Sequence, residues 1–355
     1  MRALVFHMFM VVLAQAPALA AEPARGDCAD TDKTCLFDRM KQHAVRRAAT
    51  WDAQRKRPLL ERVGPAPAML VEYLTLDNRL NDFPDRPRAA APDGAFMADL
   101  HDALAELPPQ VRELVDAKLV GIYLVEGLGG TGFTDVVEEA ALEPSSGYIV
   151  LDAGVLSRLT ANSWATWKEN TPFRPQQGWR LDATIETGDR DNRKNAIQYI
   201  LLHELAHVFS IGGNIHPPWT VDAKDVQLTM QYRFFLESWH VDRWHDRYVS
   251  EFDADFPQRA KVAYYFGAKL DAADMIPTYA NLAKTNFASL YGATRPGDDF
   301  AEAFASYVHV VLMKRPWRIT IARPSAPPVI FEACWDEARC RGKRALLDRM
   351  LGARD

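Results

Sequence analysis

The sequence predicts an α+β fold in which a small sheet lobe is followed by a helical lobe. Two short runs of β-branched and aromatic residues bounded by glycines, 119–125 and 147–151, are typical of strands. After residue 190 the apolar spacing becomes helical, first from Asn192 to Phe209 and again over 298–313. Strands that precede a group of long helices are characteristic of the α+β class.

The composition is that of an ordinary globular protein with one large or two modest domains. The 355 residues are 48% hydrophobic and 25% charged, which excludes collagen-like and wholly disordered chains. The chain has 42 Lys and Arg against 47 Asp and Glu, a formal charge of −5. Such a surface does not attract phosphate backbones or anionic lipid as a whole, so we expect no nucleic-acid partner.

Residues 1–20 have the features of a cleaved secretory signal. Arg2 precedes an apolar run over 3–14, and 18–20 form an A-x-A cleavage site. The run is shorter than the about 20 residues of a membrane-spanning helix, and no later segment is apolar enough to span. We therefore expect a periplasmic or secreted protein that begins near Ala21, with a charge of −5 − 1 = −6 once Arg2 is removed.

The four cysteines form two close pairs near opposite ends of the chain, Cys28 with Cys35 and Cys334 with Cys340. In an exported protein an even number of cysteines predicts disulfides, here two. Pairing within each couple is the simplest connectivity, and crosswise pairing stays open. A zinc site made of the four cysteines is disfavoured, because C-x6-C and C-x5-C lack the tight spacing of such sites.

The chemistry is concentrated in an H-E-x-x-H motif, His203-Glu204-Leu205-Ala206-His207, inside the first long helix. Histidines at i and i+4 lie one above the other on a helix face and can bind one zinc ion. Glu204 lies about 100° further round, beside the open position of the metal, where it can act as a general base. The flanking residues are apolar nearly all round, which predicts a buried helix and makes two solvated histidines an unfavourable alternative.

The second helix offers a third ligand. Asp298 and Glu302 are at i and i+4 on one face, among apolar neighbours. The two carboxylates of such a pair can have different roles: one can bind the metal while the other accepts a hydrogen bond from the remaining N–H of a ligand histidine. The alternative is a charged helix start, which capping and the helix dipole favour in any case.

These two segments resemble the gluzincin metallopeptidases of the anthrax lethal factor and Pro-Pro endopeptidase type. The resemblance covers His203 to His207 and the stretch from Tyr291 to Phe304, in which Tyr291 precedes Asp298 by seven residues. It implies that Asp298 is the third zinc ligand, that Glu302 is an acid behind the ligands, and that Tyr291 donates a hydrogen bond in the transition state.

The resemblance implies an exported zinc endopeptidase with one zinc ion, Glu204 and Tyr291 as catalytic residues, and a peptide or protein substrate. We expect a zincin-like catalytic domain at 111–355. The helical spacing from Leu36 to about Arg47 and a Pro-rich stretch over 84–92 predict a helical N-terminal region with loops at 21–110, about which the resemblance itself says nothing. The substrate would lie along a sheet edge supplied by 119–125 or 147–151. At position 298 this chain has aspartate where the family has glutamate. This difference leaves two alternatives open: Glu302 could be the third ligand, or the protein could be a catalytically silent zincin that acts as a binding or sensing protein in the envelope.

A dinucleotide site is a further alternative. The segment from Gly127 to Gly132 matches G-x-G-x-x-G, follows a predicted strand, and precedes Asp152 by 20 residues. Against it, Asp135, Glu138 and Glu139 would occupy the helix start at which a pyrophosphate must bind. A glycine-rich turn between strands is the simpler interpretation.

Three more residues attract attention outside the motifs. His240 and His245 are five residues apart, which on a helix separates them by about 140° and makes a shared metal unfavourable. Trp219 follows two prolines and lines either the cleft or the core.

Overall fold

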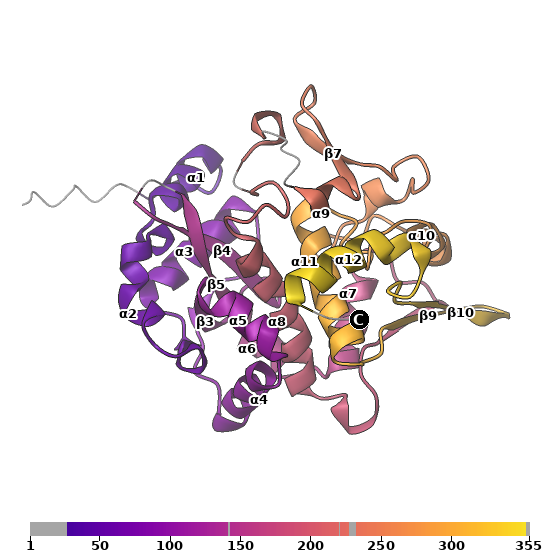
Figure 1. Cartoon of the computed structure of the whole chain (residues 1–355), viewed down its shortest axis with the longest axis horizontal. Helices are drawn as coiled ribbons and strands as arrows, with labels where there is room; N and C mark the ends of the chain where they lie inside the picture. The colour runs from indigo at the N-terminus through magenta and orange to yellow at the C-terminus, as the bar shows by residue number, and fades with distance from the viewer. Residues whose placement is uncertain (1–26, 141–142, 220, 227–231, 353–355) are drawn as a thin grey trace, which may run out of the picture.

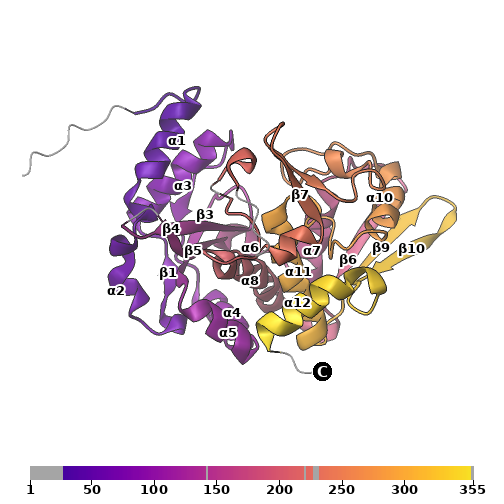
Figure 2. The ribbon, with the colours of Figure 1, turned by 45° about the horizontal axis from the view of Figure 1, so that its top comes forward.

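The computed structural model describes residues 27–140, 143–219, 221–226 and 232–352, so the predicted signal over 1–20 lies outside the described residues. Helices and three small sheets make up the fold, which confirms the coarse α+β prediction. The N-terminal and C-terminal halves of the chain lie on opposite sides of the central helix α8, Arg193–Ser210 (Figures 1 and 2).

The N-terminal half is built on a five-stranded sheet in the order β1-β3-β5-β4, with β2 paired to β3. β1, β3 and β5 are parallel, whereas β4 runs antiparallel to β5. The two strands predicted from the sequence are β3 and β5. The strands are β1 Val63–Pro65, β2 Arg88–Ala89, β3 Leu119–Glu126, β4 Gly132–Glu138 and β5 Pro144–Asp152.

Both faces of this sheet are covered, which explains why β3 is a continuous apolar run. Ile122 and Leu124 face the main core around α8, whereas Tyr123 and Val125 face a second core under α1 and α3. Alternate residues of a strand point to opposite faces, so a strand buried on both sides has no polar positions. The helices of this half are α1 Lys33–Gln42, α2 Asp52–Arg55, α3 Ala68–Leu80, α4 Gly94–Ala105, α5 Pro109–Asp116, α6 Ala153–Leu156 and α7 Ala161–Asn170.

The expected boundary near residue 110 falls in the first turn of α5 and stays a prediction. The segment before it joins the same sheet through β1 and β2, and α4 packs on α8.

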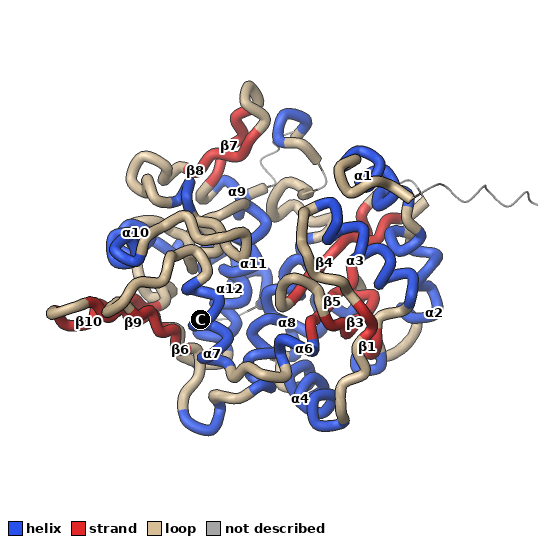
Figure 3. The backbone as a smooth tube through the Cα atoms, turned by 180° about the vertical axis from the view of Figure 1, so that it is seen from behind, coloured by secondary structure: helices blue, strands red, loops and turns tan. Residues whose placement is uncertain are grey.

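The C-terminal half contains a sheet in the order β10-β9-β6 and the hairpin β7-β8. Figure 3 shows the β6-β9-β10 sheet and the five-stranded sheet on opposite sides of α8. α11 packs directly on α8 and continues into a π-helical segment, Val308–Leu312. The elements are β6 Arg180–Thr184, α9 Arg233–Leu236, β7 Trp239–Asp242, β8 Arg247–Ser250, α10 Met275–Leu282, α11 Pro296–Tyr307, β9 Arg318–Arg323, β10 Ala326–Glu332 and α12 Arg341–Leu351.

Two disulfides close short loops, Cys28–Cys35 and Cys334–Cys340. This confirms local pairing and excludes the crosswise alternative. Among the residues with assigned positions, no helix is both long and apolar enough to cross a bilayer.

The glycine-rich segment connects two strands. β4 begins at Gly132 itself, where a dinucleotide fingerprint requires the start of a helix. Gly127 and Gly129 have positive φ values of 75° and 91°, which glycine adopts without strain. Asp152 accepts the backbone N–H of Leu128 at 2.8 Å and caps α6 through Val155. The simpler interpretation, a turn between strands, is therefore correct.

Candidate metal centre

α8 carries the H-E-x-x-H motif through the middle of the protein. Asn192 caps its start by accepting the N–H of Asn195, and its apolar residues contact the core on nearly every side. His203 and Glu204 are buried and His207 is partly buried. The sequence therefore predicted both the bounds of this helix and its burial.

α11 brings the acidic residues to α8. Pro296 is in its first turn, where a missing N–H costs nothing. Asp299 anchors the start of the helix, because it accepts hydrogen bonds from Lys343 Nζ at 2.6 Å and Trp239 Nε1 at 3.0 Å. Its neighbour Asp298 faces the motif.

The two histidines and Asp298 offer three ligand atoms that lie within 4.8 Å of one another. The Nε2 atoms of His203 and His207 are 3.1 Å apart, and His207 Nε2 is 3.5 Å from Asp298 Oδ1. Two nitrogens bound tetrahedrally to one zinc ion at about 2.0–2.1 Å are about 3.3 Å apart. The spacing and the donor set therefore fit one metal ion.

The environment of Asp298 keeps it ionised. Burial alone would raise the pKa of this carboxyl, but the facing His207 and the charge of Arg295 lower it below its ordinary value. Its second oxygen lies 3.3 Å from Thr294 Oγ1 and from Arg295 Nε. The other oxygen of Asp298, Oδ1, faces the histidines and is available to a metal ion.

Glu302 lies behind His203. Its Oε1 is 3.0 Å from His203 Nδ1 and accepts a hydrogen bond from Lys168 Nζ at 2.7 Å, while Oε2 accepts one from Ser289 Oγ at 2.6 Å. Burial opposes the ionised form, but the charge of Lys168 and the contact with His203 hold the pKa of Glu302 well below its ordinary value. Glu302 thus orients His203 with Nε2 toward the metal position. Both oxygens of Glu302 already have partners, so Asp298 is better placed to be the third metal ligand.

Glu204 points to the other side of the motif, toward β4. Thr134 Oγ1 donates a hydrogen bond to Glu204 Oε2 at 2.6 Å. At Gly132, a Cβ atom would come within 2.5 Å of Glu204 Oε1. The absence of a side chain at Gly132 therefore makes room for this carboxylate, which is a role that the motif G-x-G-x-x-G did not suggest.

Two tyrosines face the same site. The ring of Tyr291 stacks on His203 at 5.6 Å, and Lys168 Nζ lies 4.8 Å from its centre. Tyr265 packs beside Tyr291 at 6.3 Å. Its backbone has a positive φ of 68°, a strained conformation for a bulky residue of the kind that clusters at functional sites.

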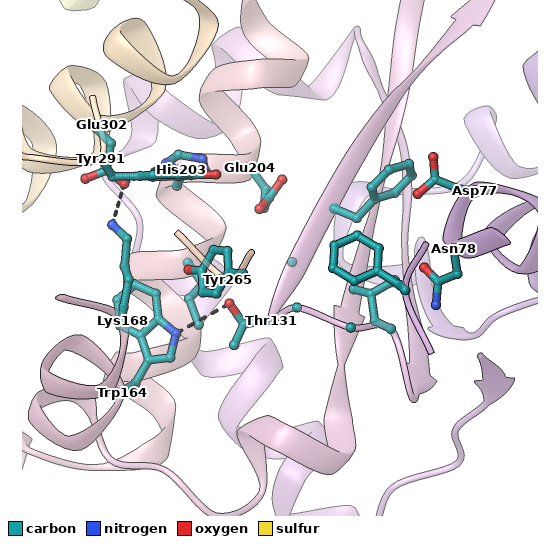
Figure 4. Close-up of a pocket in the computed structure, with 17 residues that line it drawn as sticks. Asp77, Asn78, Thr131, Trp164, Lys168, His203, Glu204, Tyr265, Tyr291 and Glu302 are labelled. Atoms are coloured by element: carbon teal, nitrogen blue, oxygen red, sulfur yellow. Dashed lines mark hydrogen bonds and ion pairs between the residues drawn. The ribbon is translucent and has the colours of Figure 1, made fainter. Parts of the chain in front are cut away.

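A cavity of about 150 Å³ opens beside these groups. Figure 4 shows Glu204 in its middle, with Tyr291, His203 and Glu302 at one end and Asp77 and Asn78 at the other. The further lining residues are Phe83, Leu128, Gly129, Gly130, Thr131, Gly132, Phe133, Trp164, Lys168, Ile200 and Tyr265.

The remaining candidates fall outside this cavity. His240 and His245 lie in and beside the β7-β8 hairpin, not on a helix, and they pair with Glu251 and Asp242 at 2.7 Å. The helical geometry assumed for them is therefore wrong, although neither joins the metal centre. Trp219 lies with its ring 5.8 Å from that of His207 and is 40% exposed, so it flanks the site and is not a core residue.

Sequence reasoning missed Lys168, Ser289, Thr134 and Tyr265. Each reaches the site from a separate segment, and none belongs to a motif. The sequence around Lys168 carries no clear signal, because α7, Ala161–Asn170, mixes polar and apolar residues and Lys168 is followed by Glu169 and Asn170.

Comparisons with known proteins gave no match: no family model, no curated protein and no solved structure is similar to this chain. The site itself is therefore the basis for assigning a function.

Proposed function

We propose that the protein is a zinc-dependent endopeptidase with a zincin-type fold. One observation carries this proposal: two motif histidines and Asp298 offer three ligand atoms within 4.8 Å of one another, and the motif glutamate lines the same cavity as His203. Two imidazoles and a carboxylate are a donor set that zinc favours in catalytic sites, with the fourth position open to water.

Each residue of the site has a defined part in peptide hydrolysis. Bound at this point, zinc would polarise the scissile carbonyl and lower the pKa of water to about 7. Glu204 takes the proton of the attacking water and delivers it to the leaving amine. Thr134 holds Oε2 of Glu204, which fixes the orientation of the base. Tyr291 donates a hydrogen bond to the developing oxyanion.

The edge of the five-stranded sheet suits an extended peptide. The expectation that 119–125 or 147–151 supplies this edge is wrong, because β3 and β5 are paired on both sides. β4 is the terminal strand of the sheet and carries Gly132 and Thr134 against Glu204. A substrate strand that adds to β4 would pass directly over the base.

The two disulfides are compatible with export, since such bonds persist in oxidising compartments. We therefore infer a periplasmic or secreted enzyme. N-terminal sequencing of the exported protein should find a start within a residue or two of Ala21, and a start at Met1 would contradict the signal.

Metal analysis and cleavage of a mixed peptide library by the purified mature protein test the proposal. We expect one zinc per chain, cleavage that stops on chelation, and recovery on addition of zinc. Glu204→Gln should keep zinc and lose activity by at least about 10²-fold, while Glu113→Gln, an exposed substitution on α5, should be neutral. A zinc-loaded protein that cleaves nothing would be the catalytically silent zincin, and a protein without zinc affinity would refute the metal centre.

A further inference from the structure

The cavity beside the metal centre contains an acid that the mechanism does not use. Asp77 on α3 lines the same cavity as Glu204. Its side chain extends from α3 toward the cavity, at the end opposite Tyr291 and Glu302 (Figure 4).

Asp77 has no counter-ion. Its carboxylate accepts one hydrogen bond, from Asn81 Nδ2 at 3.2 Å, and within the described ranges no Lys, Arg or His forms an ion pair with it. A neighbouring buried acid, Asp135, has both a cation, Arg46 at 3.7 Å, and a hydroxyl partner, Tyr73. Asp77 is therefore the acid of this region that is left without charge compensation.

The end of the cavity at Asp77 favours a positive charge. Its lysine, Lys168, is neutralised by Glu302 at 2.7 Å and has Glu169 at 3.7 Å. Glu204 lies beside the metal position and would be compensated by a bound metal ion, whereas Asp77 has no such cation. An anion at the Asp77 end would meet an uncompensated carboxylate, whereas a cation would compensate it.

The path to Asp77 suits a long side chain with a charged end. The aromatic residues Phe83 and Phe133 line the same cavity, and the backbone N–H of Phe83 donates a hydrogen bond to the carbonyl of Asn78, the neighbour of Asp77, at 2.8 Å. Aromatic rings pack against the methylene groups of lysine and arginine and attract their charged ends. Burial, followed by the charge of Asp135, raises the pKa of Asp77 to about 7, and a bound cation would favour its ionised form again.

We propose that Asp77 determines specificity by receiving the ammonium or guanidinium group of a substrate lysine or arginine beside the scissile bond. This inference rests on the proposed peptidase function and adds a substrate class to it. Asp77 takes part in no bond-breaking step, so its removal changes selection among peptides and leaves the chemistry intact.

Profiling of cleavage sites in a peptide library tests the inference. Zinc-loaded wild-type protein should select lysine or arginine at one position next to the cut. For a peptide with lysine there, Asp77→Asn should lower kcat/KM by about tenfold or more, while the matched norleucine peptide is cleaved equally by both proteins. Asp102→Asn, the same change at an exposed position of α4, should alter neither value. Cleavage without any preference for basic residues would overturn the inference and leave the peptidase proposal standing.

A binding measurement separates the two proposals if no peptide is cleaved. N-acetyl-arginine amide and N-acetyl-citrulline amide differ only in the charge of the terminal group, and an NMR titration gives their affinities for the metal-loaded protein. We expect arginine to bind at least about tenfold more tightly than citrulline and the difference to vanish in Asp77→Asn. Equal affinities in the wild type would refute the role of Asp77, whatever the outcome for catalysis.

Discussion

Gly132 and Glu204 approach each other so closely that a methyl group on Gly132 would lie 2.5 Å from Glu204 Oε1. The contact involves the end of a flexible side chain, so the protein can relieve it by moving the carboxylate. Such a movement would pull Glu204 away from Thr134, its hydrogen-bond partner at 2.6 Å. The edge strand β4 and the general base are therefore fitted to each other.

Gly132→Ala should lower peptidase activity without unfolding the protein or releasing zinc. Displacing a general base forfeits a large share of its about 10²–10⁴-fold contribution, and we expect kcat/KM to fall by at least about tenfold. Gly130→Ala is the matched control, because its Cβ would meet only Gly132 O at 3.8 Å, an ordinary contact. Equal activity of the two variants would show that the position of Glu204 is not critical.

The zinc content of variants at the two positions distinguishes the roles of Asp298 and Glu302. Asp298→Ala should leave the protein zinc-poor after dialysis, and Asp298→Glu should keep zinc because it retains the carboxylate. Glu302→Gln should weaken zinc by only about 10–100-fold, since Glu302 acts through His203. Zinc content by mass spectrometry, with circular dichroism as the check of folding, decides between them. Loss of zinc in Glu302→Gln but not in Asp298→Ala would reverse the assignment.

Those features of the site that depend on local sequence were predictable. The helix around His203 follows from apolar spacing and an Asn cap, and α11 follows from the spacing around Asp298. The edge strand was missed because β5 inserts between β3 and β4, and strand order is a non-local property. For the same reason no pattern could place Lys168 behind Glu302, 134 residues away.

A similar limit explains the error at His240. Its neighbours include Trp239 and Val241, which pair with Ser250 and Tyr248 across the β7-β8 hairpin. The short aromatic run fits a strand or a helix by composition alone, and the hydrogen-bonded partner strand decides the outcome.

Reduction of the disulfides should destabilise the oxidised protein without abolishing the metal centre directly. Each bond closes a short loop, with sequence separations of 7 and 6 residues, and loops of this length correspond to about 2 kcal/mol each in the chain-entropy model. We expect a lower midpoint of urea unfolding after reduction and no free thiol before it. Thiol titration under denaturing, non-reducing conditions measures the second quantity, and four reactive thiols would refute the pairing.

The buried ion pair between Lys343 and Asp299 should set the stability of the helix that carries Asp298. Both side chains are fully buried and their charged atoms are 2.6 Å apart. Lys343→Met would leave Asp299 as a buried charge without its cation, although the hydrogen bond from Trp239 remains, and losing one partner of such a pair costs about 3–5 kcal/mol.

The double variant Lys343→Met with Asp299→Asn tests the physical cause. It removes both charges, so the free energy of unfolding should recover most of the loss. The exposed pair of Lys33 with Asp82 is the control, because Lys33→Met should cost at most about 1 kcal/mol. Urea unfolding gives the three values. If the double variant is no more stable than Lys343→Met, packing of the lysine side chain, and not the unpaired charge of Asp299, holds α12 against α11.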